Sequence, residues 1–171
     1  MIRLVFPERR YLASYIDAFD EFQSQCVSTY GLTDARYIDV FQKFDRYRLA
    51  KDLPSDRVGA DYYWLVDDAT DSFLGEITIR HRLNAALELR GGHIGYAVRF
   101  SEWNKGYGTL MLKLALEQAR SRGLTDILIT CNDSNIASAR IMEKNGLILQ
   151  DKVTIKDDSE EVLVRRYRIH L

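Results

Sequence analysis

The sequence is poor in the residues that build metal centres and disulfides. It holds three histidines, each standing alone, and two cysteines, Cys26 and Cys131, far apart along the chain. No Cys/His spacing typical of a bound metal occurs, so we predict no metal site. Two isolated cysteines in a reducing compartment are typical of buried thiols rather than of a disulfide.

Long apolar runs are missing as well. No stretch approaches the roughly 20 apolar residues that a membrane-spanning helix needs. The first ten residues lack the apolar segment of a secretory signal. We therefore expect a cytoplasmic protein with no membrane partner.

Neither sign of charge dominates, because the net charge is −1 and no long run of one sign occurs. This balance disfavours a nucleic-acid partner held by bulk electrostatics. The arginine-rich stretch 165–168 alternates with apolar residues and favours a strand. The chain has 171 residues, 46% of them hydrophobic, and no linker rich in proline, glycine or serine. We predict a single domain over residues 1–171.

The spacing of apolar residues predicts the element order β-α-α-β-β-β-α-β-α-β-β. The expected strands are 2–6, 61–66, 73–80, 93–99, 126–131, 147–156 and 161–170, and the expected helices are 11–27, 35–50, 110–121 and 135–145. Thr33 and Asp34 are the expected cap of the second helix, 84–89 a linker, and 156–159 the turn of the last hairpin.

This order predicts a mixed α/β (α+β) fold, in which an antiparallel meander joins a strand–helix–strand unit in one mixed sheet of about seven strands. The apolar strand 126–131 is typical of a strand buried on both faces and parallel to its neighbour. The ends of strands 93–99 and 126–131 are expected to splay apart and open a ligand cleft.

The stretch 99–109 leads from a strand through Gly106 and Gly108 into a helix. Backbone N–H groups at a helix start are unpaired and can hold an anion, and glycine lets a phosphate approach the backbone closely. A pyrophosphate cradle and a turn that only starts a helix both fit this stretch. No Gly-Lys-Ser/Thr follows, which excludes a P-loop, and Gly-x-Gly-x-x-Gly is incomplete, which excludes a dinucleotide fingerprint.

Two motifs in order give the chain a resemblance to the GNAT family of N-acetyltransferases. The first is Trp103-Asn-Lys-Gly-Tyr-Gly108 with the helix Thr109–Arg120, and the second is Asn135-Ile-Ala-Ser-Ala-Arg-Ile-Met-Glu-Lys-Asn-Gly146. The resemblance implies the GNAT fold and direct transfer of an acetyl group from acetyl-CoA (coenzyme A) to a primary amine of a small molecule or protein. It leaves a homodimer open. A non-catalytic acyl-CoA-binding or regulatory module is the alternative.

The resemblance also implies a set of cofactor-binding residues. The pantetheine arm would pair with the strand backbone, and the pyrophosphate would lie on the loop amides, with Asn135 and Ser138 lining the same cleft. The residues so implied are Tyr96, Ala97, Val98, Arg99, Asn104, Lys105, Gly106, Tyr107, Gly108, Thr109, Asn135 and Ser138. Alternatives are a solvated Lys105 and a helix-capping Asn135. Trp103 replaces the family's basic or amide residue, and either packs on the adenosine or is a surface aromatic.

The catalytic residues are less well specified by the resemblance. Many members place a tyrosine acid seven residues after the asparagine, where this chain has Met142. Either the thiolate leaves through water, or another residue is the acid; Tyr96 and Tyr107 are nearby in sequence, and the sequence does not rank them. His93 and Glu76 are the candidate bases, each with a purely structural alternative.

A covalent role for Cys131 is disfavoured against a buried structural thiol. Choice of the acceptor is expected in the first two helices and in residues 81–92.

Overall fold

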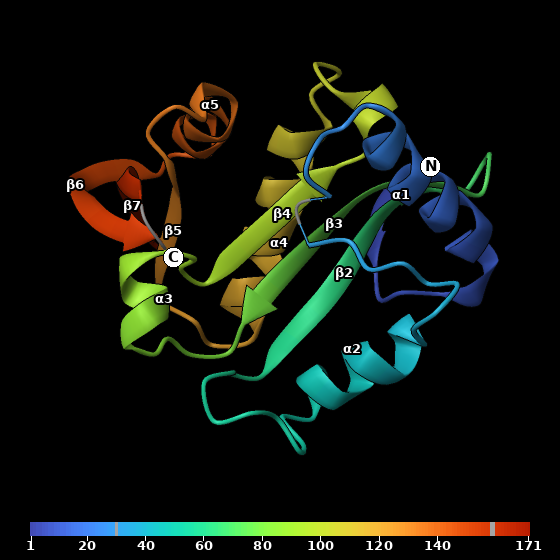
Figure 1. The fold of residues 1–171 in the computed structure, drawn as a ribbon, viewed down its shortest axis with the longest axis horizontal. Helices are drawn as coiled ribbons and strands as arrows, with labels where there is room; N and C mark the ends of the chain where they lie inside the picture. Colours follow the sequence, from blue (N-terminus) through green and yellow to red (C-terminus); the bar gives the residue numbers. More distant parts are fainter. Residues whose placement is uncertain (30, 158–159) are drawn as a thin grey trace.

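The computed structural model describes residues 1–29, 31–157 and 160–171. Its strands form two sheets (Figure 1). The first has the order β1-β2-β3-β4, with all neighbours antiparallel, and the second has the order β5-β7-β6, also antiparallel. The strand bounds are β1 Ile2–Val5, β2 Ala60–Asp67, β3 Ser72–Arg80, β4 Ile94–Val98, β5 Asp126–Asn132, β6 Ile148–Asp157 and β7 Glu160–His170.

Helices cover both faces of the four-stranded sheet. The short 3-10 turn η1 (Arg9–Tyr11) leads into α1 (Leu12–Ser24), and α1 and α2 (Val40–Arg48) pack on one face. The long α4 (Tyr107–Ser121) packs on the other face. The remaining elements are α3 (Ala85–Leu89), the 3-10 turn η2 (Phe100–Glu102) and α5 (Ile136–Lys144).

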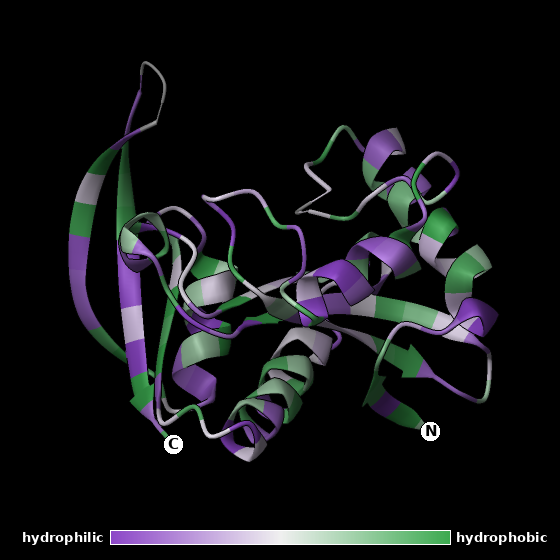
Figure 2. Ribbon diagram, turned by 90° about the horizontal axis from the view of Figure 1, so that it is seen from below, coloured by the Kyte–Doolittle hydropathy of each residue, from purple (hydrophilic) through white to green (hydrophobic). Residues whose placement is uncertain are grey.

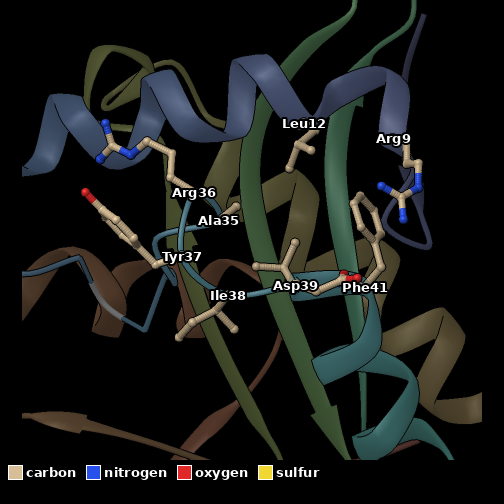
Figure 3. Close-up of a pocket in the computed structure, with 9 residues that line it drawn as sticks. Arg9, Leu12, Ala35, Arg36, Tyr37, Ile38, Asp39 and Phe41 are labelled. Carbon is tan, nitrogen blue, oxygen red and sulfur yellow. The ribbon is translucent and has the colours of Figure 1, made fainter.

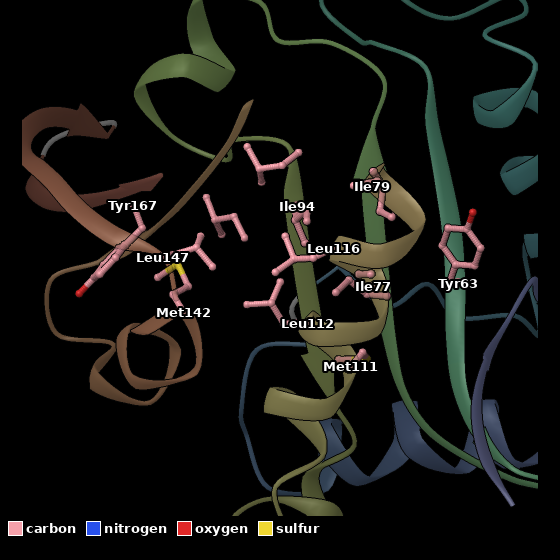
Figure 4. Packing of buried hydrophobic residues seen from close by; sticks show 14 of the residues in the cluster. Tyr63, Ile77, Ile79, Ile94, Met111, Leu112, Leu116, Met142, Leu147 and Tyr167 are labelled. Atoms are coloured by element: carbon pink, nitrogen blue, oxygen red, sulfur yellow. The ribbon is translucent and has the colours of Figure 1, made fainter. Parts of the chain in front are cut away.

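Strand alternation divides the hydrophobic core into two clusters. On β2, Trp64 and Val66 point to the α1/α2 side, whereas Tyr63 and Leu65 point to the α4 side. The α4-side cluster also takes in side chains of the second sheet and α5, among them Met142, Leu147 and Tyr167 (Figure 4). The α4-side cluster therefore holds the two sheets together.

Between β4 and β5 the strands separate, and we call this gap the seam. The two sheets are joined at one end of it, where the His93 N–H donates to the Leu128 carbonyl at 2.7 Å and Gly92 forms an isolated bridge with Ile129. No ladder joins β4 to β5 in the part of the chain that the structure describes. The predicted splay is confirmed.

The predicted parallel pairing of strands 93–99 and 126–131 in one sheet is wrong. The chain enters β4 through Gly91 and Gly92, both with positive φ, and Gly92 lies against the Leu128 carbonyl so closely that a Cβ would sit 2.3 Å from it. This close approach joins the two sheets at a single point, and β5 forms its hydrogen-bonded ladder with β7 instead of β4.

Other boundaries also differ from the sequence-based expectation. The second helix starts at Val40 rather than Ala35, because the Asp39 carboxylate caps it by accepting from the N–H groups of Phe41 and Gln42. The expected cap residue Asp34 binds Arg36 instead. The linker 84–89 contains α3, capped by Asn84. The last hairpin is confirmed, while Asp158 and Ser159 of its turn lie outside the described residues.

Figure 2 shows hydrophobic residues concentrated in the strands of the four-stranded sheet, and alternating hydropathy along the β6–β7 hairpin. Among the described residues, no helix has the length and apolar character to cross a bilayer. Both cysteines are free thiols; Cys131 is buried, but Cys26 is exposed, so the expectation of two buried thiols holds for one of them.

Candidate active site

The start of α4 presents a row of unpaired backbone donors. Gly106, at φ +87°, is its N-cap and supplies no side-chain cap. In the described chain, no protein acceptor faces the N–H groups of residues 104–109. Open space surrounds the position that a Gly106 Cβ would occupy. This cradle, at the positive end of a helix of 15 residues, fits an anion such as a pyrophosphate.

Gly108 lies where α4 and α5 pack against each other. A Cβ at this position would lie 2.6 Å from Ile141 Cδ1 of α5 and 3.5 Å from a Val98 methyl group. The missing side chain lets α4 and α5 approach each other closely. Open space at Gly106 and the close approach of α5 at Gly108 distinguish the two glycines, and phosphate binding at either one stays a prediction.

Trp103 is fixed by the chain itself. Its indole Nε1 donates to the Val98 carbonyl at 2.8 Å, and its ring lies 4.7 Å from the Phe100 ring and 6.3 Å from the Phe22 ring. Trp103 thus closes the turn between β4 and the loop, with 38% of the residue exposed. Lys105, beside it, forms an ion pair with Glu102 at 3.1 Å.

The backbone of β4 has one edge bound and one edge open to the seam. The Arg99 N–H donates to Leu74, and the His93 carbonyl accepts from Arg80, both on the β3 side. Alternation in an antiparallel ladder turns the Ala97 groups to β3 as well, and the N–H groups of Tyr96 and Val98 to the seam. Of the four backbone positions predicted to meet pantetheine, Tyr96 and Val98 have N–H groups that face the seam.

The Arg99 side chain points away from the seam and links the loop to α1. Its guanidinium donates to the Glu21 carboxylate at 2.5 and 2.8 Å and to the Ser14 hydroxyl at 2.9 Å. The same carboxylate accepts from the Ser101 N–H. Burial acts to raise the pKa of Glu21, but the hydrogen bonds from Arg99 and Ser101 outweigh it and lower the pKa.

Glu76 is a buried carboxyl on β3, the strand that pairs with the bound edge of β4. It lies on β3 directly opposite Ala97 of β4 and opposite Trp64 of β2. It is 7% exposed, and its Oε2 accepts from Trp64 Nε1 at 3.0 Å. Burial raises the pKa of Glu76 to about 7, against the opposing effects of the Trp64 hydrogen bond and the Lys43 charge. Such a carboxyl can take up a proton near neutral pH.

The groups around Glu76 are ones that the sequence reasoning missed. Lys43 of α2 donates to the Thr33 hydroxyl at 2.6 Å, and burial lowers its pKa. Tyr62 shares the Glu76 side of the sheet, and burial raises its pKa to about 12. The period of two along β2 could have placed Tyr62 and Trp64 on one face. Nothing in the sequence pattern places Lys43 over them.

His93, the other predicted base, lies at the closed end of the seam. Its Nδ1 accepts from the Leu128 N–H at 3.1 Å, and burial lowers its pKa. It stands four residues before Ala97, about 13 Å along an extended strand. The structure therefore places Glu76, and not His93, beside the middle of β4.

Across the seam, α5 supplies polar groups. The Asn135 side-chain oxygen caps α5 by accepting from the Ser138 N–H at 3.0 Å, so the predicted capping alternative is present. The Ser138 hydroxyl lies 2.7 Å from the Tyr96 hydroxyl. Met142 is fully buried in the core. Burial raises the pKa of the Cys131 thiol, which fits a structural thiol rather than a nucleophile.

A cavity of about 250 Å³ lies between η1, α1 and the segment 35–41 (Figure 3). The Phe41 ring, which lines it, is 6.0 Å from the Trp64 ring, whose indole binds Glu76. The cavity is thus on the Glu76 side of the sheet. Its lining residues are Arg9, Leu12, Ala35, Arg36, Tyr37, Ile38, Asp39, Val40 and Phe41.

Comparison with known proteins agrees with this geometry. The sequence matches the family description "Acetyltransferase (GNAT) domain" over residues 15–148. A GNAT-family acetyltransferase from Bacillus anthracis is similar in structure, with a TM-score of 0.64 and 18% identity over 99% of this chain and 94% of that one. No curated protein matches the sequence.

Two structures from Salmonella typhimurium are also similar. One is an acetyl transferase that modifies the N-terminal serine of the 50S ribosomal subunit protein L7/L12. Its TM-score is 0.71, and it is 13% identical over 99% of this chain and 95% of that one. The other, yncA, was solved with its cofactor acetyl-CoA; it has a TM-score of 0.64 and 13% identity over 99% of this chain and 93% of that one. At these identities the likeness concerns the fold.

Proposed function

This chain belongs to the GNAT acetyltransferase family, and on that premise we propose that it moves an acetyl group from acetyl-CoA directly to a primary amine of a small molecule or protein. The observation that carries the proposal is one of arrangement. The open edge of β4 leads along the chain to an anion cradle at Gly106, the N-cap of α4, and the buried Glu76 carboxyl lies on the neighbouring strand β3.

The residues present fit the family's cofactor. Amides of residues 104–109 would hold the pyrophosphate, and the seam-facing N–H groups of Tyr96 and Val98 would pair with the pantetheine arm, as an added strand does. The Asn135 side-chain oxygen already caps α5, and its NH2 group would be the donor to a ligand. Acetyl-CoA supplies an acetyl group activated as a thioester.

Glu76 is the proposed base. Glu76 lies opposite Ala97 and among the aromatic side chains of the α1/α2-side cluster. We infer that the amine enters from this side of the sheet. A pKa of about 7 lets it accept the proton that the amine loses on attack. The seam-facing N–H groups of β4 would polarise the thioester carbonyl. Choice of acceptor falls to the cavity beside α1 and to residues of segment 35–41.

Titration calorimetry with acetyl-CoA, followed by thiol release with a panel of primary amines, tests the proposal. We expect saturable binding and amine-dependent release of coenzyme A. Binding without release for any amine would favour the non-catalytic acyl-CoA module. The absence of binding would overturn both readings.

A further inference from the structure

Three polar side chains from three separate elements converge on the seam. Tyr96 extends from the middle of β4 and reaches Ser138 in the first turn of α5, with 2.7 Å between the hydroxyl oxygens. Cys131 of β5 lies next to them, its thiol 3.9 Å from the Asn135 carbonyl. The Tyr96–Ser138 contact is a side-chain bridge between the two halves of the molecule, away from the closed end at His93.

This bridge lies on the side of the sheet opposite Glu76. Tyr96 is paired with Ile77 of β3, whose side chain belongs to the α4-side core, whereas Glu76 faces α1 and α2. On the proposed function, on which this inference rests, the amine enters from the Glu76 side. The coenzyme A sulfur then has to accept charge as it leaves. On the opposite side of β4, the Tyr96 hydroxyl is a proton donor that reaches across the seam to Ser138.

The other candidates for this role are poorly placed. Met142 is fully buried among apolar side chains, and a thioether has no proton to donate. Tyr107 starts α4 and packs its ring against the α4-side core. The structure therefore ranks the two tyrosines that the sequence left equal.

We propose that the Tyr96 hydroxyl, held in place by Ser138, is the donor to the coenzyme A sulfur. As the amine nitrogen bonds to the acetyl carbon, the C–S bond breaks and its electron pair stays on sulfur. Tyr96 gives its hydroxyl proton to the sulfur and takes one back from Ser138, whose hydroxyl is recharged by water. Glu76 holds the proton lost by the amine, and water removes it, so protons and charge balance over the cycle.

The surroundings keep this proton available. Burial raises the pKa of Tyr96 above its ordinary value, with the Ser138 hydrogen bond acting in the opposite direction. The hydroxyl therefore stays protonated throughout the pH range in which an acceptor amine becomes neutral. Ser138 is a positioning residue, because it acts on the sulfur only through Tyr96.

A pair of ligands isolates the contact with sulfur: coenzyme A and desulfo-coenzyme A, which lacks only that atom. Calorimetry on the wild type should show tighter binding of coenzyme A by about 2- to 10-fold, the range of one net hydrogen bond. The preference should grow with pH, because a thiolate accepts a stronger hydrogen bond. In Tyr96→Phe the ratio of the affinities for coenzyme A and desulfo-coenzyme A should fall to about one. In the control Tyr107→Phe the preference for coenzyme A should persist.

Kinetics give a second readout. Tyr96→Phe should lower kcat by about 100-fold, the usual loss for one donor to a developing negative charge, with the Kd of acetyl-CoA changed less than about threefold. Ser138→Ala should lower kcat less, and Ser138→Thr, which restores a hydroxyl, should recover it.

The binding measurements distinguish a failure of the Tyr96 inference from a failure of the proposed function. A Tyr96→Phe protein that still prefers coenzyme A over the desulfo compound would overturn the inference, and so would a wild type with no preference. If the wild type binds neither compound, the proposed function itself fails. If Tyr96→Phe does not fold, the Ser138→Ala and Ser138→Thr pair decides: a preference that Ala weakens and Thr restores supports the inference, and a preference unchanged in both overturns it.

Discussion

The arginines of the three-stranded sheet and Glu76 of the four-stranded sheet differ in whether they have a charged partner. On the three-stranded sheet, Arg165, Arg166 and Arg168 each bind an aspartate, at distances of 2.5 to 2.7 Å. On the four-stranded sheet, Glu76 is buried and forms no ion pair with any residue that the structure describes. Partly exposed ion pairs contribute little to stability. A buried carboxyl without a paired cation is costly, and such groups are concentrated at functional sites.

The arginines illustrate the first half of this contrast. Their alternation with Val164 and Tyr167 predicts a strand, and β7 confirms it. Their aspartate partners come from β5, β6 and the β5–α5 connection, so the cluster neutralises itself. The basic stretch of the sequence is thus a set of ion pairs with neighbouring elements in the structure.

The largest effect should come from removing the unpaired carboxyl. We expect Glu76→Gln to lower kcat/KM by about a thousandfold, within the range of general-base catalysis. In the wild type, activity should rise with pH through about 7, since only the ionised carboxyl accepts a proton and burial raises its pKa to about that value. This acid limb should be missing in Glu76→Gln. A pH–rate profile of both proteins measures it.

Two variants serve as controls for this test. Asp151→Asn removes a paired carboxylate of the other sheet, the partner of Arg166, and should leave activity within about twofold because exposed ion pairs contribute little. His93→Asn keeps an acceptor for the Leu128 N–H and should keep the acid limb near pH 7. Loss of that limb in His93→Asn, with Glu76→Gln unaffected, would reverse the assignment of the base.

The second effect compares the two ends of α4. Gly106 and Gly123 both have positive φ, +87° and +81°, and open space where a Cβ would be. Replacing either with valine should cost about 1–2 kcal/mol of stability through backbone strain. Only Gly106→Val should also weaken acetyl-CoA binding, by about 100-fold, since charge-assisted hydrogen bonds to the phosphates are lost. Thermal unfolding measures the loss of stability, and calorimetry measures acetyl-CoA binding. Equal acetyl-CoA affinities of the two variants would contradict the proposed anion cradle at Gly106.

Local signals in the sequence found most elements and the Gly106 loop. Period-two and period-3.6 patterns predicted the strands and the long helices, because each pattern reports which face of one element is buried. They could not predict that Gly92 would cross Leu128, or that Trp103 would bind the Val98 carbonyl. Those contacts depend on where separate elements meet in space. The burial of Glu76 under α1 and α2 is of the same kind.

Gly108 gives the smallest effect and the sharpest contrast with Gly106, two positions away. Valine at 108 would meet Ile141 of α5, whose Cδ1 lies 2.6 Å from an added Cβ. We expect Gly108→Val to destabilise the protein by about 2 kcal/mol through overpacking, measured by urea unfolding. In the double variant with Ile141→Ala the clash is relieved, so the combined cost should fall below the sum of the single costs. Strict additivity would mean that α4 and α5 do not meet at this point.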